Sequence, residues 1–223
     1  MILVAFDTAS PSTVAGVLRA DGRVVEARDD PPPGSRGDHA ARLLVLVEQA
    51  LAQAGVGWGA VERIAVGVGP GGFTGLRIGV ATARALAQGH ALPLVPVGSL
   101  EALALAAGGE GAVAAVLDAR RGEVFAGVWE GGRERSAPAA LAPEALARRL
   151  ARMGETVRAV GDGAVRFRAE LEATGVTVPA DGASVHRISA APLCRLGAVA
   201  RPAQRDRLLP DYRREPDAKP PQP

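Results

Sequence analysis

A glycine-rich segment between an apolar strand and a helix constrains this chain more than any other feature. It covers residues 67–79 and reads Gly-Val-Gly-Pro-Gly-Gly-Phe-Thr-Gly-Leu-Arg-Ile-Gly. Glycine reaches positive φ without steric cost and carries no Cβ that would hold a neighbour away. The segment therefore predicts a close approach of the backbone to a phosphate, to a facing helix, or to both.

The two common nucleotide-binding motifs do not fit this segment. Gly67, Gly69 and Gly72 match the dinucleotide pattern, but that pattern also needs a ribose-binding carboxylate about 20 residues later. No Asp or Glu lies between Glu62 and Glu101. The Walker pattern fails as well, because no lysine follows the glycines to reach a phosphate.

Small residues recur along the helix that follows the loop, which is predicted over 74–88. Gly75, Gly79 and Ala83 are spaced by four residues and so share one face of the helix. Leu76 and Val80 fill the adjacent apolar positions. Such a bare stripe indicates that another backbone lies on it, either inside the fold or in a partner.

Composition favours a globular protein whose net charge is too small to argue for nucleic-acid binding. Of the 223 residues, 48% are hydrophobic, and the 26 basic and 24 acidic residues leave a formal charge of only +2. Aromatic residues make up 3% of the chain, which argues against a base-stacking platform for single-stranded nucleic acid. The lone Cys194 suits a reducing compartment, and Asp7 interrupts the apolar start too early for a signal peptide. We expect a cytoplasmic protein with no membrane segment.

The order of strand, aspartate, hairpin and turn recurs in the two halves of the chain and indicates an internal duplication. Leu3–Asp7 and Ala114–Asp118 are both apolar strands that end in aspartate, and Ala-Gly-Val follows each at the same interval. Each copy continues through a hairpin turn, a further strand, and then a helix, a strand and a helix. This order predicts the duplicated α/β fold of actin, Hsp70 and sugar kinases, with two lobes that each hold a mixed central sheet flanked by helices.

The expected lobes are residues 1–108 and 109–209, followed by a mobile polar tail over 210–223 in which Tyr212 is the expected anchor. The helices of the first lobe are predicted at 38–54, 74–88 and 99–107. Those of the second lobe are predicted at 143–153, 164–174 and 189–200.

In this fold, nucleotide phosphates lie between the lobes at the hairpins that follow the first strand of each. The candidate nucleotide-binding or phosphate-binding residues are therefore Asp7, Thr8, Gly71, Gly72, Thr74 and Asp118. An equally good interpretation is that each aspartate only caps its own turn through hydrogen bonds to the backbone.

Four segments together resemble the TsaB (YeaZ) family. They are Phe-Asp-Thr-Ala-Ser at 6–10, Gly-Pro-Gly-Gly-Phe-Thr-Gly-Leu-Arg at 69–77, Leu-Asp-Ala-Arg-Arg-Gly-Glu-Val-Phe at 117–125, and Pro-Asp-Tyr at 210–212. The resemblance implies a bacterial accessory protein needed to make N6-threonylcarbamoyladenosine next to the anticodon of tRNAs that read A-starting codons. It implies a TsaD-like catalytic subunit and a TsaE-like ATPase as partners, with tRNA met through the complex and a homodimer when the chain is alone.

The resemblance further implies that ATP and metal belong to the partner subunits and that this chain binds no cofactor alone. TsaD places two metal-binding histidines four apart on a helix, whereas the equivalent positions here are Ser99 and Leu103. The histidines His39, His90 and His186 are scattered and are expected at the surface or at helix caps. We therefore predict no metal and no catalytic centre. The predicted partner surface consists of Leu43, Leu44, Val47, Leu51, Gly75, Leu76, Gly79, Val80 and Ala83.

Two other functions are compatible with parts of the sequence. The aspartate hairpins and the glycine loop also suit an independent ATP-dependent small-molecule kinase, although Asp118 and Glu123 are the only evident candidates for its general base. A peptidase is a weaker alternative, because Ser99 lacks the glycine of a nucleophile elbow and Cys194 has no better case.

Overall fold

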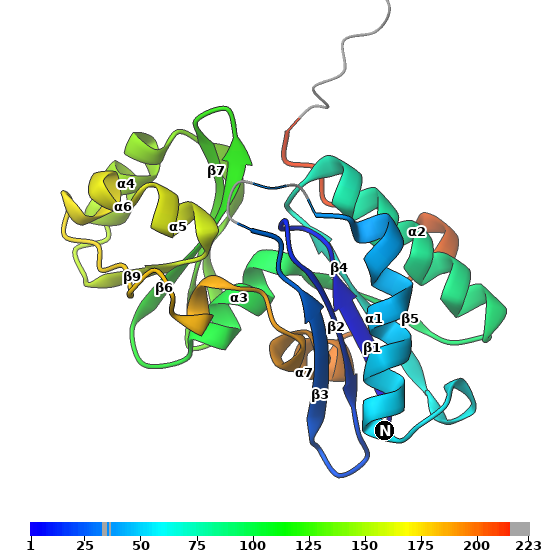
Figure 1. The fold of residues 1–223 in the computed structure, drawn as a ribbon. Helices are drawn as coiled ribbons and strands as arrows, with labels where there is room; N and C mark the ends of the chain where they lie inside the picture. The colour runs from blue at the N-terminus through cyan, green and yellow to red at the C-terminus, as the bar shows by residue number, and fades with distance from the viewer. Residues whose placement is uncertain (33–34, 36, 215–223) are drawn as a thin grey trace, which may run out of the picture.

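The computed structural model describes residues 1–32, 35 and 37–214 (Figure 1). Two lobes lie side by side, and each is built on one β-sheet. The predicted duplicated α/β fold is confirmed, because the strand order 3-2-1-4 of the first sheet recurs as 8-7-6-9 in the second. In both sheets the first strand pairs antiparallel with the second and parallel with the strand that follows the meander.

The first lobe contains a five-stranded sheet in the order β3-β2-β1-β4-β5. Helices α1 and α2 cover one face of this sheet and pack beside each other. Helix α1 begins after Asp38, whose carboxylate accepts a hydrogen bond from the Ala41 N–H, as is typical of an N-cap. The elements are β1 (Leu3–Asp7), β2 (Thr13–Leu18), β3 (Val24–Asp29), α1 (His39–Ala54), η1 (Trp58–Ala60), β4 (Arg63–Gly69), α2 (Phe73–Gly89), β5 (Leu94–Gly98) and α3 (Ser99–Ala107).

The second lobe contains a four-stranded sheet in the order β8-β7-β6-β9. The single helix predicted over 164–174 is instead two short helices, which meet at Phe167 with its non-helical φ of −111° and ψ of 33°. The elements are β6 (Ala112–Arg120), β7 (Glu123–Glu130), β8 (Arg133–Leu141), α4 (Pro143–Ala151), β9 (Val157–Val160), α5 (Asp162–Arg166), α6 (Arg168–Glu172), η2 (Ser184–His186), α7 (Ala190–Val199) and η3 (Arg205–Arg207).

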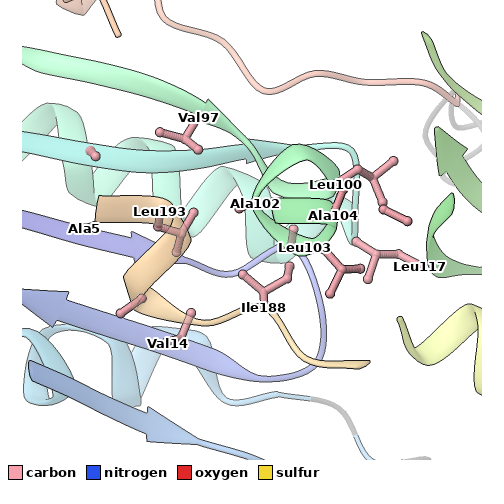
Figure 2. Packing of buried hydrophobic residues seen from close by; sticks show 14 of the residues in the cluster. Ala5, Val14, Val97, Leu100, Ala102, Leu103, Ala104, Leu117, Ile188 and Leu193 are labelled. Carbon is pink, nitrogen blue, oxygen red and sulfur yellow. The ribbon is translucent and has the colours of Figure 1, made fainter. Parts of the chain in front are cut away.

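Alternation along β1 separates two hydrophobic cores, because successive side chains of a strand point to opposite faces. Val4 and Phe6 pack beneath α1 and α2, whereas Leu3 and Ala5 face the core on the other side of the sheet. This second core extends into the second lobe (Figure 2), where Leu117 of β6 lies near Leu103 of α3. Helix α3 therefore joins the two lobes through buried apolar side chains.

Helix α7 lies on the first sheet, although the sequence places it at the end of the second lobe. It packs against β1, β2 and β4. Two glycines permit this approach, since a Cβ on Gly197 would lie 2.5 Å from the Cβ of Ala65, and one on Gly16 would lie 2.3 Å from the Cβ of Ala190. The free thiol of Cys194 is buried in this interface.

The predicted mobile tail begins with residues that have defined contacts. Tyr212 lies against the start of α2 and is an anchor there, as predicted. Residues 215–223 lie outside the described residues. Among the helices of the described chain, none combines the length and the apolar character that crossing a bilayer requires.

Candidate functional site

A cleft of about 590 Å³ opens between the two lobes. We call it the interlobe cleft. The first lobe lines it with the loop after β1, the start of α1 and the glycine loop with the start of α2, while the second lobe contributes the end of β6 and Asp162. Of the predicted nucleotide-binding residues, Thr8, Gly71, Gly72, Thr74 and Asp118 are all brought together along this cleft. The prediction that they bind a phosphate stays a prediction.

Asp7 does not lie on the cleft surface, which corrects its prediction as a phosphate-contacting residue. The side chain is buried behind the cleft, where it accepts hydrogen bonds from the Ser99 hydroxyl at 2.5 Å and from the Ala9 N–H at 2.7 Å. Burial raises the pKa of Asp7, although both hydrogen bonds oppose this effect. The bond to Ala9 matches the alternative interpretation, in which the aspartate caps its own turn.

The glycine loop approaches the chain's own backbone at close range. A Cβ on Gly67 would lie 1.7 Å from an Asp7 carboxylate oxygen, and one on Gly71 would lie 2.4 Å from the Ala9 carbonyl oxygen. The Gly72 N–H donates to that same carbonyl at 2.7 Å. The loop therefore packs β4 and α2 against the turn that follows β1, which explains its glycine content without any ligand.

The small-residue stripe of α2 faces the same turn. A Cβ on Gly75 would lie 2.1 Å from the Thr8 carbonyl oxygen, and one on Gly79 would lie 2.3 Å from Thr8 Oγ1. The Thr8 hydroxyl donates a hydrogen bond of 2.7 Å to the Gly75 carbonyl. Of the two interpretations of the stripe, close packing inside the fold is therefore the correct one.

The predicted partner surface is corrected by the same packing. Eight of its nine residues are buried inside this chain and cannot contact another protein without a rearrangement. Leu44 is the exception, with 50% of its surface exposed, and the adjacent Val45 is 52% exposed. The buried residues are Leu43, Val47, Leu51, Gly75, Leu76, Gly79, Val80 and Ala83.

On the second lobe, the cleft is bordered by a charged cluster at the end of β6. Asp118 forms ion pairs with Arg166 at 2.7 Å and with Arg120 at 3.6 Å. Asp162 accepts a hydrogen bond of 3.0 Å from the Asp118 N–H, and burial raises the pKa of Asp162. Asp118 also accepts a bond from the Arg120 N–H, so it caps its turn as Asp7 does. Sequence spacing did not identify Asp162 as a cleft residue, because it lies at the start of α5 and only the folded structure brings α5 beside the end of β6.

Two of the three histidines are buried, contrary to the expectation of surface or capping positions. His39 Nδ1 lies 2.8 Å from the Thr13 hydroxyl, and burial lowers the pKa of His39. His186 accepts a hydrogen bond from the Gly161 N–H at Nδ1, and its Nε2 lies 3.1 Å from the Pro179 carbonyl. His90 is exposed and stacks on the Trp58 ring at 4.4 Å.

The residues present do not fit a metal centre like that of TsaD. Leu103 is fully buried and has no ligand atom, while the Ser99 hydroxyl donates to Asp7 and accepts from the Gly69 N–H. Within residues 1–32, 35 and 37–214, no group of three or more His, Cys, Asp or Glu side chains is placed to hold a metal ion.

Comparison with known proteins identifies the family. Residues 31–167 match the family described as TsaD, tRNA N6-adenosine threonylcarbamoyltransferase. The chain is 43% identical over 91 residues to the tRNA threonylcarbamoyladenosine biosynthesis protein TsaB of Haemophilus influenzae, covering 39% of this chain and 38% of that protein. It is 34% identical over 137 residues to Escherichia coli TsaB, covering 56% of this chain and 58% of that protein. The chain therefore aligns with less than two thirds of the length of either curated TsaB protein.

Longer matches come from an uncharacterized protein and from solved structures. Protein Rv3421c of Mycobacterium tuberculosis is 34% identical over 230 residues, covering 98% of this chain and 94% of that protein. The structure of YeaZ from Pseudomonas aeruginosa matches with a TM-score of 0.75 and 29% identity, covering 95% of this chain and 99% of that one. A ROK hexokinase from Thermus thermophilus, with a TM-score of 0.52 and 16% identity over 89% of this chain and 99% of that one, shares the fold alone. Sequence and structure together place this chain in the TsaB (YeaZ) family.

Proposed function

We propose that this chain is a non-catalytic accessory subunit in the formation of N6-threonylcarbamoyladenosine in tRNA. It acts by binding a TsaD-like catalytic subunit, and it meets a TsaE-like ATPase and tRNA through the resulting complex. Two curated relatives carry the name of this biosynthetic process, which supports the process assigned here. ATP and metal are used by the partner subunits in this proposal.

The observation that carries the non-catalytic role is the chemistry at Ser99 and Leu103. In TsaD the equivalent helix supplies two histidines as metal ligands, whereas here one position holds a buried leucine and the other a hydroxyl used inside the fold. The Ser99 hydroxyl joins Asp7 to Gly69 and so connects the ends of β1 and β4. Ser99 and Leu103 therefore support a structural role for α3 in this chain, in place of the metal-binding role of the equivalent helix in TsaD. The same engagement of Ser99 leaves no support for a peptidase nucleophile.

The proposed docking surface is the outer side of α1, which we call the α1 face and define by Leu44 and Val45. Both side chains are about half exposed, and they are adjacent on a helix whose other large apolar residues are buried. Helix α2 packs beside α1 and adds the exposed alanines Ala81 and Ala85. The adjacent exposed side chains of Leu44 and Val45 support an interaction site on α1. In the absence of the catalytic subunit, we expect two copies of the chain to pair through this face.

The proposed docking is tested by placing a charge on the α1 face. Leu44→Glu and Val45→Glu each bury an unpaired carboxylate if the face docks, so we expect affinity for the purified TsaD-like subunit to fall about tenfold or more. Val199→Glu is the matched control, because Val199 is 83% exposed on α7, which covers the opposite face of the first sheet. Calorimetry measures the three affinities. Unchanged affinity in both α1 variants would contradict docking at this face.

A further inference from the structure

The segment that follows α7 crosses from the first lobe to the second along the interlobe cleft. It starts from Leu208, whose side chain is buried in the core beneath α1 and α2. The Asp211 N–H donates a 2.7 Å hydrogen bond to the Val68 carbonyl near the end of β4. The segment is therefore fixed to the first lobe before it reaches the cleft.

Tyr212 adds a second attachment to the first lobe. Its ring centre lies 4.9 Å from that of Phe73, the first residue of α2, and its hydroxyl accepts a 3.1 Å hydrogen bond from Arg77 Nε. The Arg77 guanidinium also lies 3.8 Å from the centre of the Phe73 ring. These three side chains form one cluster, in which the tilted Tyr212 and Phe73 rings pack together and the Phe73 ring face attracts the Arg77 cation.

Arg214 connects the segment to the second lobe. Its Nη1 donates to the Ala119 carbonyl at 2.7 Å and to a Glu123 carboxylate oxygen at 3.2 Å. Ala119 lies next to the last residue of β6, and Glu123 is the first residue of β7. Both acceptors therefore belong to the β6–β7 hairpin on the far side of the cleft. Tyr212, Arg213 and Arg214 all line the cleft.

The lobes are also connected by apolar packing, which lies at α3 and not along the cleft. Helix α3 packs on β6 and β7 through buried side chains such as Leu100 and Leu103 (Figure 2), and no described α3 residue lines the cleft. A joint at α3 and a polar link across the cleft are thus two separate attachments. If the polar link breaks, the lobes stay joined at α3 but lose a constraint on their separation.

We propose that Pro210–Arg214 form a latch that holds the two lobes together across the interlobe cleft, with α3 as the hinge. The latch is anchored by Tyr212 and Asp211 on the first lobe and is fastened by Arg214 on the second. Its release opens the cleft. Figure 1 shows this segment in red between the start of α2 and the β6–β7 hairpin.

Fluorescence energy transfer between the lobes of the isolated chain tests the latch. Gln53→Cys on α1 and Arg149→Cys on α4 supply exposed labelling sites on different lobes. The native Cys194 does not compete, because it is buried and its pKa is raised to about 12. A chain that ends at Leu209 lacks the latch, whereas a chain that ends at Arg214 keeps it and serves as the control for the loss of residues 215–223.

We expect lower transfer efficiency for the chain that ends at Leu209 and unchanged efficiency for the chain that ends at Arg214. Arg214→Ala should shift the efficiency in the same direction as the shorter chain. Arg213→Ala is the matched point control, because Arg213 pairs with Asp211 at 2.7 Å inside the segment, and it should cause no shift. Equal efficiencies for Arg214→Ala and the parent chain, or equal losses in the two truncated chains, would overturn the latch. The test needs no partner, so its outcome is independent of the proposed function.

Discussion

Replacing Gly79 by alanine places a methyl group where Thr8 already stands. The new Cβ would lie 2.3 Å from Thr8 Oγ1, far inside van der Waals contact. Overpacking of this kind typically costs about 1–3 kcal/mol. Moving the Thr8 hydroxyl also endangers its hydrogen bond to Gly75, worth about 0.5–1.5 kcal/mol. Since alanine gains about 0.5–1 kcal/mol over glycine within a helix, we expect a net loss of stability of about 1–3 kcal/mol.

The same substitution should behave differently when Thr8 is alanine. Removing Oγ1 leaves the Thr8 Cβ as the nearest atom of that residue, at an ordinary contact distance of 3.6 Å. Only the helix preference of alanine then remains, so Gly79→Ala should become neutral or stabilise by up to about 1 kcal/mol. The two backgrounds should therefore differ by at least about 1 kcal/mol, a coupling typical of residues in direct contact.

Denaturant unfolding of the four chains of this double-mutant cycle measures the coupling. Gly89→Ala is the matched control, because Gly89 also lies in α2 but has open space around its Cβ position. It should not lower stability. If Gly79→Ala destabilises both backgrounds equally, contact with Thr8 is not the reason why position 79 needs a glycine, and the assigned packing of α2 is wrong.

Three further predictions follow from buried groups. Because burial raises the folded pKa of Asp7 above its unfolded value, the stability contributed by this group is full below about pH 4 and falls as the pH rises through the folded pKa. Asp7→Asn should remove this loss of stability. If the unfolding free energies of the two chains keep a constant difference from acid to neutral pH, the prediction is wrong. Cys194, with its pKa raised to about 12, should react with a disulfide reagent at pH 8 only after unfolding, and rapid reaction of the native chain would mean that α7 detaches readily. Gly197→Leu should lower stability by about 2 kcal/mol or more through its clash with Ala65, whereas an unchanged melting temperature would contradict the packing of α7 on the first sheet.

Much of the fold could be predicted because strand periodicity and turn residues act locally. The pairs Leu3–Asp7 and Ala114–Asp118 revealed the duplication, and the structure repeats the strand order around both. The position of α7 could not be predicted in this way, since an apolar helix face does not specify which of two sheets it covers. Only two close contacts of α7 with the first sheet show the choice, Gly197 against Ala65 and Ala190 against Gly16, and both join residues that are distant in sequence.

The candidate site was predicted less well, for a physical reason. An apolar stripe on a helix indicates burial but does not distinguish the core of its own chain from that of a partner. Leu43 and Val47 follow the stripe and are buried, whereas Leu44 and Val45 depart from it and are exposed. In our proposal, the signal for a docking surface is therefore an exposed apolar residue outside the buried stripe. Asp162 escaped detection because only the fold brings α5 beside β6.

Reconstitution of the tRNA modification with and without this chain tests the central claim most directly. Purified TsaD-like and TsaE-like subunits are incubated with tRNA, ATP and threonylcarbamoyl-adenylate, and modified adenosine is measured by mass spectrometry. We predict that modification requires this chain, that the chain alone produces none, and that Leu44→Glu lowers the yield whereas Val199→Glu does not. Equal modification in the presence and absence of the chain would contradict its role as a required accessory subunit.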